Sequence, residues 1–313
     1  MSEARNTRLR AVWHYYAHGM TQADIATKLG VSRATVNKLL DTARGRGEIR
    51  IWLDEPADEC MALALKVELA LGVPEVIVVP TGPDRAATTR AAGLALGRLL
   101  SGRIVNGIRV GLGWGRTLTA ALDAFQPPLR DGVEVISLLG GQVRPAMPDP
   151  AGLAWRMATA LGAECLLLPA PLRVDSPETR TRLIEHCGIG ALLDRVSALD
   201  LAVLSVGAAN DADASLSLQL LTPDEQADLR AAGAVGDVLA TFIDAEGRTV
   251  DHPANATIMA AGLDQIVSAK ARILTATGAD RAKALSAAHM RLSATTLVID
   301  EAAAQALLAR GHP

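Results

Sequence analysis

The feature that most constrains the fold is a repeated alternation, beginning after Gly72, between short β-branched runs and longer Ala/Leu-rich segments. Strands that alternate with helical segments are typical of a parallel sheet covered by helices. Half of the residues are apolar but only 3% are aromatic, so small aliphatic side chains must do most of the packing. The sequence therefore predicts an α/β fold with an open, mostly parallel sheet and helices on both faces. The predicted strands are 76–79, 109–112, 133–138, 165–168, 201–206, 234–243, 272–274 and 296–299, and the predicted helices include 86–100, 118–125, 153–161, 178–185 and 280–290.

Glycine-rich loops follow several of the predicted strands, and ligands of open α/β sheets bind beyond the carboxyl ends of the strands. The richest loop is 111–117, Gly-Leu-Gly-Trp-Gly-Arg-Thr, which also opens a predicted helix. Its glycines allow a ligand to approach the backbone, and Arg116 and Thr117 add a charge and a hydroxyl to the free N–H groups of a helix N-terminus. Similar turns occur at Gly140-Gly141, 205–207 and 233–237. Together they favour a pocket for an anion, although tight turns also use glycine without any ligand, and neither GxGxxG nor a P-loop is present.

Residues 21–40, TQADIATKLGVSRATVNKLL, have the spacing of a helix-turn-helix. Thr21 and Ser32 are suited to cap the N-termini of two helices, and Gly30 can adopt the positive φ of the sharp turn between them. The expected buried side chains of the two helices are Ile25, Ala26, Leu29, Val36, Leu39, Leu40 and Ala43.

The polar face of the second predicted helix has residue types that read DNA bases. Arg and Asn make bidentate contacts with guanine and adenine in the major groove, and Lys38 can reach a base or a phosphate. An αα-hairpin with a solvated polar face is the alternative, but the two caps, the glycine and the apolar pattern all favour DNA binding. The residues expected at double-stranded operator DNA are Gln22, Ser32, Arg33, Ala34, Thr35, Asn37 and Lys38, with Gln22 and Thr35 at phosphates.

Charge is distributed unevenly along the chain. The first 50 residues have nine Lys/Arg and four Asp/Glu, a balance of +5, which leaves −8 for the other 263 residues because the whole chain is −3. A basic N-terminal segment followed by an acidic remainder is consistent with DNA phosphate contacts that are confined to one small domain. We expect a DNA-binding domain with a short linker at 1–56, in which 49–53 could form a wing or an edge strand. We expect an α/β effector and oligomerisation domain at 57–313, in which an apolar helix at 58–71 could join the domains or pair with a second subunit.

Other sequence features exclude several classes of protein. No apolar stretch reaches about 18 residues and the first residues lack the core of a signal peptide, so we expect a cytoplasmic protein without a membrane partner. Three cysteines, far apart and odd in number, indicate neither a disulfide framework nor a zinc site. His14 and His18 are four residues apart on a predicted helix, but packing or surface roles are favoured over metal binding.

The whole chain resembles the SorC/DeoR-type sugar-sensing bacterial transcriptional regulators. TQADIATKLGVSRATVNKLLDTARGRGEIRI resembles their DNA-binding head, and VGLGWGRTL, LLGG, LLLPAP, SVG, GAVGD and LVIDEAAAQALL resemble successive landmarks of their effector domain. The resemblance implies a winged-helix-like head, a sensor domain similar in fold to sugar-phosphate isomerases, a phosphorylated sugar or polyol as effector, and a homo-oligomer of two or four subunits.

The resemblance also implies roles for particular residues. The turn Gly113, Trp114, Gly115, Arg116 and Thr117 would hold the phosphate. Gly140, Gly141 and Asp237 would border the sugar, and Lys283 would face the pocket. The chain departs from the family at 275–278, where Thr-Ala-Thr-Gly replaces a glycine-rich turn, and at Ala256, where a basic residue is frequent.

Two other functions remain as alternatives. A phosphosugar isomerase or deaminase would need an acid/base pair, but 205–211 contains no histidine and the chain has no Lys-Gly-Gly-Gly run, so we expect no catalytic residues and no enzyme activity. A DNA-binding protein that uses its α/β part only for assembly is the other alternative. We expect neither a cofactor nor a metal.

Overall fold

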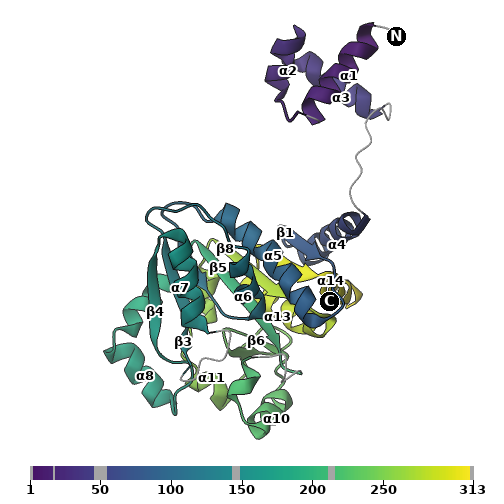
Figure 1. Cartoon of the computed structure of the whole chain (residues 1–313). Helices are drawn as coiled ribbons and strands as arrows, with labels where there is room; N and C mark the ends of the chain where they lie inside the picture. Colours follow the sequence, from purple (N-terminus) through teal and green to yellow (C-terminus); the bar gives the residue numbers. More distant parts are fainter. Residues whose placement is uncertain (1–2, 17, 46–54, 143–148, 211–215, 311–313) are drawn as a thin grey trace. The chain divides into compact units, whose positions relative to one another are not determined.

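The computed structural model describes residues 3–16, 18–45, 55–142, 149–210 and 216–310 (Figure 1). The chain divides into two compact units, Met1–Glu55 and Pro56–Pro313. The wing or edge strand expected at 49–53 lies outside the described residues. In the part of the chain that the structure describes, no helix is both long and apolar enough to cross a membrane.

The first unit contains three helices, α1 (Glu3–Tyr16), α2 (Gln22–Leu29) and α3 (Arg33–Gly45). The Thr21 hydroxyl caps α2 by accepting a hydrogen bond from the Asp24 N–H (3.2 Å), and Gly30 ends α2 with a φ of +65°. The Ser32 hydroxyl accepts one from the Thr35 N–H (3.1 Å) at the start of α3. The small core consists of Ala11, Ile25, Ala26, Val36 and Leu40.

The large aromatic side chains of α1 do not all pack against the core. Trp13 is 63% exposed and Tyr16 is 40% exposed, whereas Ala11 is fully buried and Tyr15 packs against the core. The small side chain of Ala11 belongs to the core that α1 shares with α2 and α3.

The second unit is built on a nine-stranded sheet with the order β1-β9-β8-β5-β2-β3-β4, and every pair along this path is parallel. β6 and β7 form an antiparallel extension attached to β5. The strands are β1 (Glu75–Val79), β2 (Arg109–Leu112), β3 (Glu134–Gly141), β4 (Glu164–Pro171), β5 (Leu201–Ala208), β6 (Gly236–Val238), β7 (Thr241–Ile243), β8 (Ala271–Ala276) and β9 (Thr296–Asp300).

Helices connect and cover these strands. The chain crosses the sheet in one direction from β1 to β4 and returns through β5, β8 and β9, so right-handed crossovers place α5–α7 and α13 on opposite faces. The helices are α4 (Glu55–Leu71), α5 (Arg85–Arg103), α6 (Arg116–Asp123), α7 (Pro150–Leu161), α8 (Pro177–His186), α9 (Ile189–Val196), α10 (Pro223–Ala231), α11 (Pro253–Thr257), α12 (Leu263–Val267), α13 (Ala282–Leu292) and α14 (Glu301–Ala309), with 3₁₀ turns η1 (Leu218–Leu220) and η2 (Ala279–Arg281).

The strand predicted at 234–243 is instead a tight hairpin of β6 and β7. Leu239 and Ala240 form its two-residue turn, and both are buried with positive φ values of 54° and 57°. Hairpin turns of this kind usually contain Asn-Gly. Here Leu-Ala occupies the turn, and neither residue type indicates a turn in the sequence. Gly236 is needed where β6 meets β5, because a Cβ there would lie 2.3 Å from the Gly207 carbonyl oxygen.

The direction of the chain switches between the neighbouring strands β2 and β5. From β2 the chain continues to β3 on one side, and beyond β5 the next strand of the sheet is β8 on the other side. Loops diverge at such a switch point and leave a crevice outside the carboxyl ends of the strands. The fold therefore places a binding crevice beside the glycine-rich loop that follows β2.

Candidate functional site

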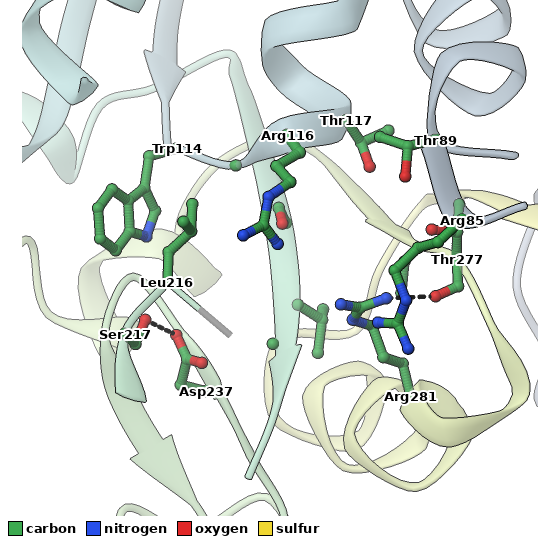
Figure 2. A pocket seen from close by; sticks show the side chains of 15 residues that line it. Arg85, Thr89, Trp114, Arg116, Thr117, Leu216, Ser217, Asp237, Thr277 and Arg281 are labelled. Atoms are coloured by element: carbon green, nitrogen blue, oxygen red, sulfur yellow. Dashed lines mark hydrogen bonds between the residues drawn. The ribbon is translucent and has the colours of Figure 1, made fainter. Parts of the chain in front are cut away.

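A pocket lies at this switch point, and the space between its walls is about 550 Å³ with the solvent at its mouth included. Its walls come from the carboxyl ends of β2, β5 and β8, from the start of α5, and from the segments that carry η1, β6 and η2 (Figure 2). The lining residues are Arg85, Thr89, Trp114, Gly115, Arg116, Thr117, Ser205, Val206, Gly207, Leu216, Ser217, Asp237, Ala276, Thr277 and Arg281.

The loop after β2 passes close against β5 because it contains glycines. Gly113 donates its N–H to the Val203 carbonyl (2.9 Å), and Gly115 has a φ of +143°. A Cβ at Gly115 would lie 2.6 Å from the Ser205 hydroxyl oxygen, so a larger residue would displace the loop. Gly115 is also the N-cap of α6, and no side chain caps the first turn of this helix at the pocket wall.

One end of the pocket is acidic and partly apolar. Asp237 is only 4% exposed, and its Oδ2 accepts a hydrogen bond of 2.5 Å from the Ser217 hydroxyl. Trp114 and Leu216 stand beside this pair in Figure 2. A buried carboxylate next to an aromatic ring can accept hydrogen bonds from ligand hydroxyls while the ring covers an apolar surface.

The other end of the pocket is basic. Arg281 is 8% exposed and donates to the Thr277 carbonyl at 2.5 Å. The Arg85 side chain lies 3.5 Å from the Asp280 carboxylate. Figure 2 shows Arg85 and Arg281 on the side away from Asp237, with Arg116 between the two ends. The pocket is therefore polarised, with two guanidinium groups (Arg85 and Arg281) at one end, a carboxylate at the other and Arg116 between them.

The structure brings together some of the residues expected at the effector and separates others. Trp114, Gly115, Arg116, Thr117 and Asp237 line the pocket, and Gly113 directly precedes this lining.

Three expected residues lie elsewhere. Gly140 donates its N–H to the Met259 carbonyl (2.9 Å), and a Cβ there would lie 2.5 Å from the Ala170 carbonyl oxygen, so this glycine serves the close approach of β3 and β4. Gly141 follows it at the end of β3. Lys283 is exposed on the first turn of α13, outside the pocket lining.

Sequence reasoning missed Arg85, Thr89, Ser217, Thr277 and Arg281. Arg281 lies two positions before Lys283, and the 3₁₀ turn η2 directs Arg281 rather than Lys283 to the pocket. The rule that ligands bind after the strands could have found it, because Thr277 and η2 directly follow β8. Arg85 and Ser217 had no such signal, since no glycine-rich strand-end turn marks either position.

The predicted DNA-reading residues share the exposed face of α3. Arg33, Ala34, Asn37 and Lys38 are exposed, while Val36 and Leu40 are buried on the opposite side. Ser32 and Thr35 are exposed at the start of the helix, where their hydroxyl oxygens lie 2.8 Å apart. Gln22 is half-buried at the start of α2 and lies next to the reading face.

The His14 and His18 rings have centroids 5.8 Å apart. Burial and the nearby charge of Lys28 lower the pKa of His14, because both disfavour the protonated imidazole ring. Within the described ranges, no group of three or more His, Cys, Asp or Glu side chains could hold a metal ion.

Comparisons with known proteins cover both units. Residues 55–309 match the family described as "Putative sugar-binding domain", and residues 5–50 match the homeodomain-like domain family. The chain is 30% identical over 313 residues to the transcriptional regulator YjhU of Escherichia coli (strain K12), which covers 96% of this chain and 94% of that protein. It is 26% identical over 311 residues to the erythritol catabolism regulatory protein EryD of Brucella abortus (strain 2308), with 97% and 96% covered.

A solved structure has the same fold over nearly the whole chain. The full-length sorbitol operon regulator SorC from Klebsiella pneumoniae matches with a TM-score of 0.74 at 23% identity, covering 98% of this chain and 100% of that one. The sugar-binding domain match over most of the chain, the helix-turn-helix head and the 30% identical relative show that this protein belongs to the SorC-type family of bacterial transcriptional regulators.

Proposed function

We propose that this protein binds an operator of a carbohydrate or polyol catabolic operon and that a phosphorylated sugar or polyol in the pocket controls its affinity for DNA. The observation that carries the proposal is the polarity of the pocket. Arg85 and Arg281 line one end, Asp237 lines the other and Arg116 lies between them, which matches a ligand with an anionic end and a hydroxyl-bearing end.

The phosphate is assigned to the loop after β2. Backbone N–H groups at the start of α6, the Thr117 hydroxyl and the Arg116 guanidinium can all donate to a dianion there. Arg281 adds a mostly buried positive charge at the adjoining basic end of the pocket, where an ion pair is screened less by water than at the surface.

The sugar or polyol hydroxyls are assigned to the other end. The Asp237 carboxylate accepts hydrogen bonds, and its bond with Ser217 holds it in position. Trp114 is 5% exposed and offers an apolar surface to the carbon skeleton of the ligand.

Catalysis is the weaker alternative for this pocket. Among the described residues that line it, Asp237 is the single carboxylate and no histidine is present. Proton transfer at a sugar carbon requires a general base that reaches the substrate, usually together with a second acid. Asp211 and Asp213, which come soon after β5 in the sequence, lie outside the described residues. Ligand sensing explains the polarity of the pocket without requiring such a pair.

The proposal is tested by ligand binding and operator binding in the same preparation. A panel of phosphorylated sugars and polyols is screened by thermal shift, each beside its unphosphorylated counterpart, and the best compound is then added to operator titrations. A ligand at about 100 times its Kd stabilises the folded protein by about 2.7 kcal/mol, which is readily detected. We expect stabilisation by a phosphorylated compound, weak or no effect of its counterpart, and a changed operator affinity. Equal stabilisation by the two forms would contradict a phosphate-based effector.

A further inference from the structure

Two arginines of the basic end are carried by loops that meet each other. Arg85 opens α5 after the loop 80–84, and Arg281 closes η2 after Gly278. Arg85 pairs with Asp280, the neighbour of Arg281, at 3.5 Å. An anion drawn to the two arginines would compete with Asp280 for Arg85. Arg85 would then exchange a partner within the protein for the ligand.

The fully buried carboxylate of Asp300 accepts hydrogen bonds from both loops. Asp300, at the end of β9, accepts hydrogen bonds at Oδ1 from the Gly278 N–H (2.8 Å) and the Ala303 N–H (3.3 Å). Its Oδ2 accepts one from the Thr81 hydroxyl (2.9 Å). Thr81 lies in the loop before Arg85 and Gly278 in the turn before Arg281, so one side chain holds both arginine-bearing loops against the start of α14. Breaking such bonds is costly, because a buried carboxylate would be left unsatisfied.

The next residue extends this contact to α4. Glu301 accepts a hydrogen bond at Oε2 from the Thr81 N–H (2.9 Å), and its Oε1 lies 3.7 Å from the Cys60 sulfur. Burial and the adjacent Glu301 raise the pKa of the Cys60 thiol to about 11, so it is protonated and donates to the carboxylate. Cys60 lies on α4, the helix that directly follows residues 46–54 and hence the DNA-reading head in the chain.

We propose that Asp300 and Glu301 are positioning residues that transmit occupancy of the basic end of the pocket to α4, and thereby to the DNA-binding head. The inference rests on the proposed function, because it requires an anionic effector at Arg85 and Arg281. When the anion replaces Asp280 as the partner of Arg85, the loops at Thr81 and Gly278 move together, since Asp300 holds both. Glu301 is hydrogen-bonded to Thr81, as Asp300 is, so a movement of this loop also shifts Glu301 and its contact with Cys60. The arrangement of α4 then differs between the free and bound states.

The first experiment measures coupling, defined as the ratio of operator Kd values with and without the best phosphorylated compound from the screen. Glu301→Ala removes the contacts with Thr81 and Cys60 but leaves every pocket-lining residue in place. We expect its ligand affinity and its ligand-free operator affinity to stay within about threefold of wild type, while the coupling ratio falls at least about fivefold. Gln305→Ala, one turn later on the exposed side of α14, is the matched control and should keep the wild-type ratio.

Cys60→Ala provides a milder variant in case Glu301→Ala does not fold, since it removes only the thiol contact on α4. It should also reduce the coupling ratio. If both variants fold and retain the wild-type ratio, the relay is wrong although the proposed function stands. If the wild-type protein neither binds a phosphorylated compound nor changes its operator affinity, the proposed function is wrong, and the relay falls with it.

The second experiment uses inorganic phosphate and does not involve DNA. The alkylation rate of Cys60 is measured by mass spectrometry with and without saturating phosphate, and the exposed Cys187 serves as the internal reference. We expect phosphate to change the Cys60 rate at least about threefold relative to Cys187, and Arg85→Ala to abolish the change. A purely structural role of Glu301 would leave the Cys60 rate unaffected by phosphate, and an unchanged rate in wild type that binds phosphate overturns the relay.

Discussion

The Gln22 side-chain amide donates a hydrogen bond to the Asn37 Oδ1 (3.3 Å), joining the first residue of α2 to the exposed face of α3. Asn37 is a predicted base-reading residue and Gln22 a predicted phosphate contact. The bond restricts the rotamers of Asn37 before DNA arrives, which lowers the entropy cost of placing its amide against a base. The two predicted roles are therefore physically linked.

The residues on the exposed face of α3 predict which substitutions change the preference of the protein for particular DNA sequences. Arg33→Ala and Asn37→Ala should each weaken operator binding by about 1–3 kcal/mol and blur the preference at one base pair, because each removes a bidentate contact. Gln22→Ala should weaken all sequences and, since it releases Asn37, also blur the preference at the base that Asn37 reads. Operator titrations against single-base variants measure both effects. Unchanged preferences for Arg33→Ala and Asn37→Ala would show that another face of α3 reads the bases.

Arg116 is predicted to bind the phosphate of the effector. Arg116→Ala should weaken the phosphorylated ligand about 10-fold or more, because a charge-assisted contact contributes about 1.5–3 kcal/mol. Operator affinity without ligand should stay nearly unchanged. Arg90→Ala, an exposed arginine on α5 outside this pocket, is the matched control for calorimetry. If Arg116 is only a solvated residue in the first turn of α6, its removal leaves ligand affinity equal to wild type.

Arg281 and Lys283 form a second matched pair. Arg281 lines the pocket and is mostly buried, whereas Lys283 is exposed outside it. Arg281→Ala should therefore weaken the phosphorylated ligand at least about 10-fold, and Lys283→Ala should change its affinity by less than about twofold. Calorimetry of the two variants measures the difference. The reverse result would return the basic pocket position to Lys283, where the family resemblance placed it.

The sensor unit is predicted to associate without the DNA-binding head. Met61, Leu65 and Leu69 are exposed at successive turns of α4, and Leu69 is 86% exposed. We expect fragment 57–313 to form a dimer or tetramer at micromolar concentration in light scattering, because this stripe is a candidate contact between subunits. Substituting all three by serine should lower the measured mass. Leu94→Ser, at an exposed position on α5, should not. A monomeric wild-type fragment would contradict the prediction.

Glu225 is predicted to make stability depend on pH under acidic conditions. Hydrogen bonds from the Arg173 side chain and from the Thr222 N–H lower the pKa of Glu225 to about 2. A carboxyl with a lowered pKa stabilises the folded state above its usual pKa of 4.5, and this contribution is lost as pH falls through about 2. Urea unfolding should show Glu225→Gln less stable by about 1–2 kcal/mol at pH 7, since solvent screens this pair, with a smaller difference near pH 3. A difference independent of pH would contradict this account.

Much of the fold could be predicted because its signals are local. The helix-turn-helix depends on caps at Thr21 and Ser32 and on a positive φ at Gly30, all of which act within a few residues. The parallel strands follow from β-branched runs bounded by helical segments, and β2 has the predicted bounds Arg109–Leu112. The hairpin at Leu239 and Ala240 escaped prediction, because surrounding packing rather than turn residues holds its backbone.

The sequence by itself determined which turns could approach a ligand and which face of α3 is polar, because backbone conformation and helical periodicity depend on neighbouring residues. Only the tertiary structure decided which side chains share the pocket. Arg85, Ser217 and Arg281 are far apart in the chain and meet because β1, β5 and β8 run parallel and end at one edge. No local pattern records such a meeting, since it depends on strand order and on crossovers that span the whole domain.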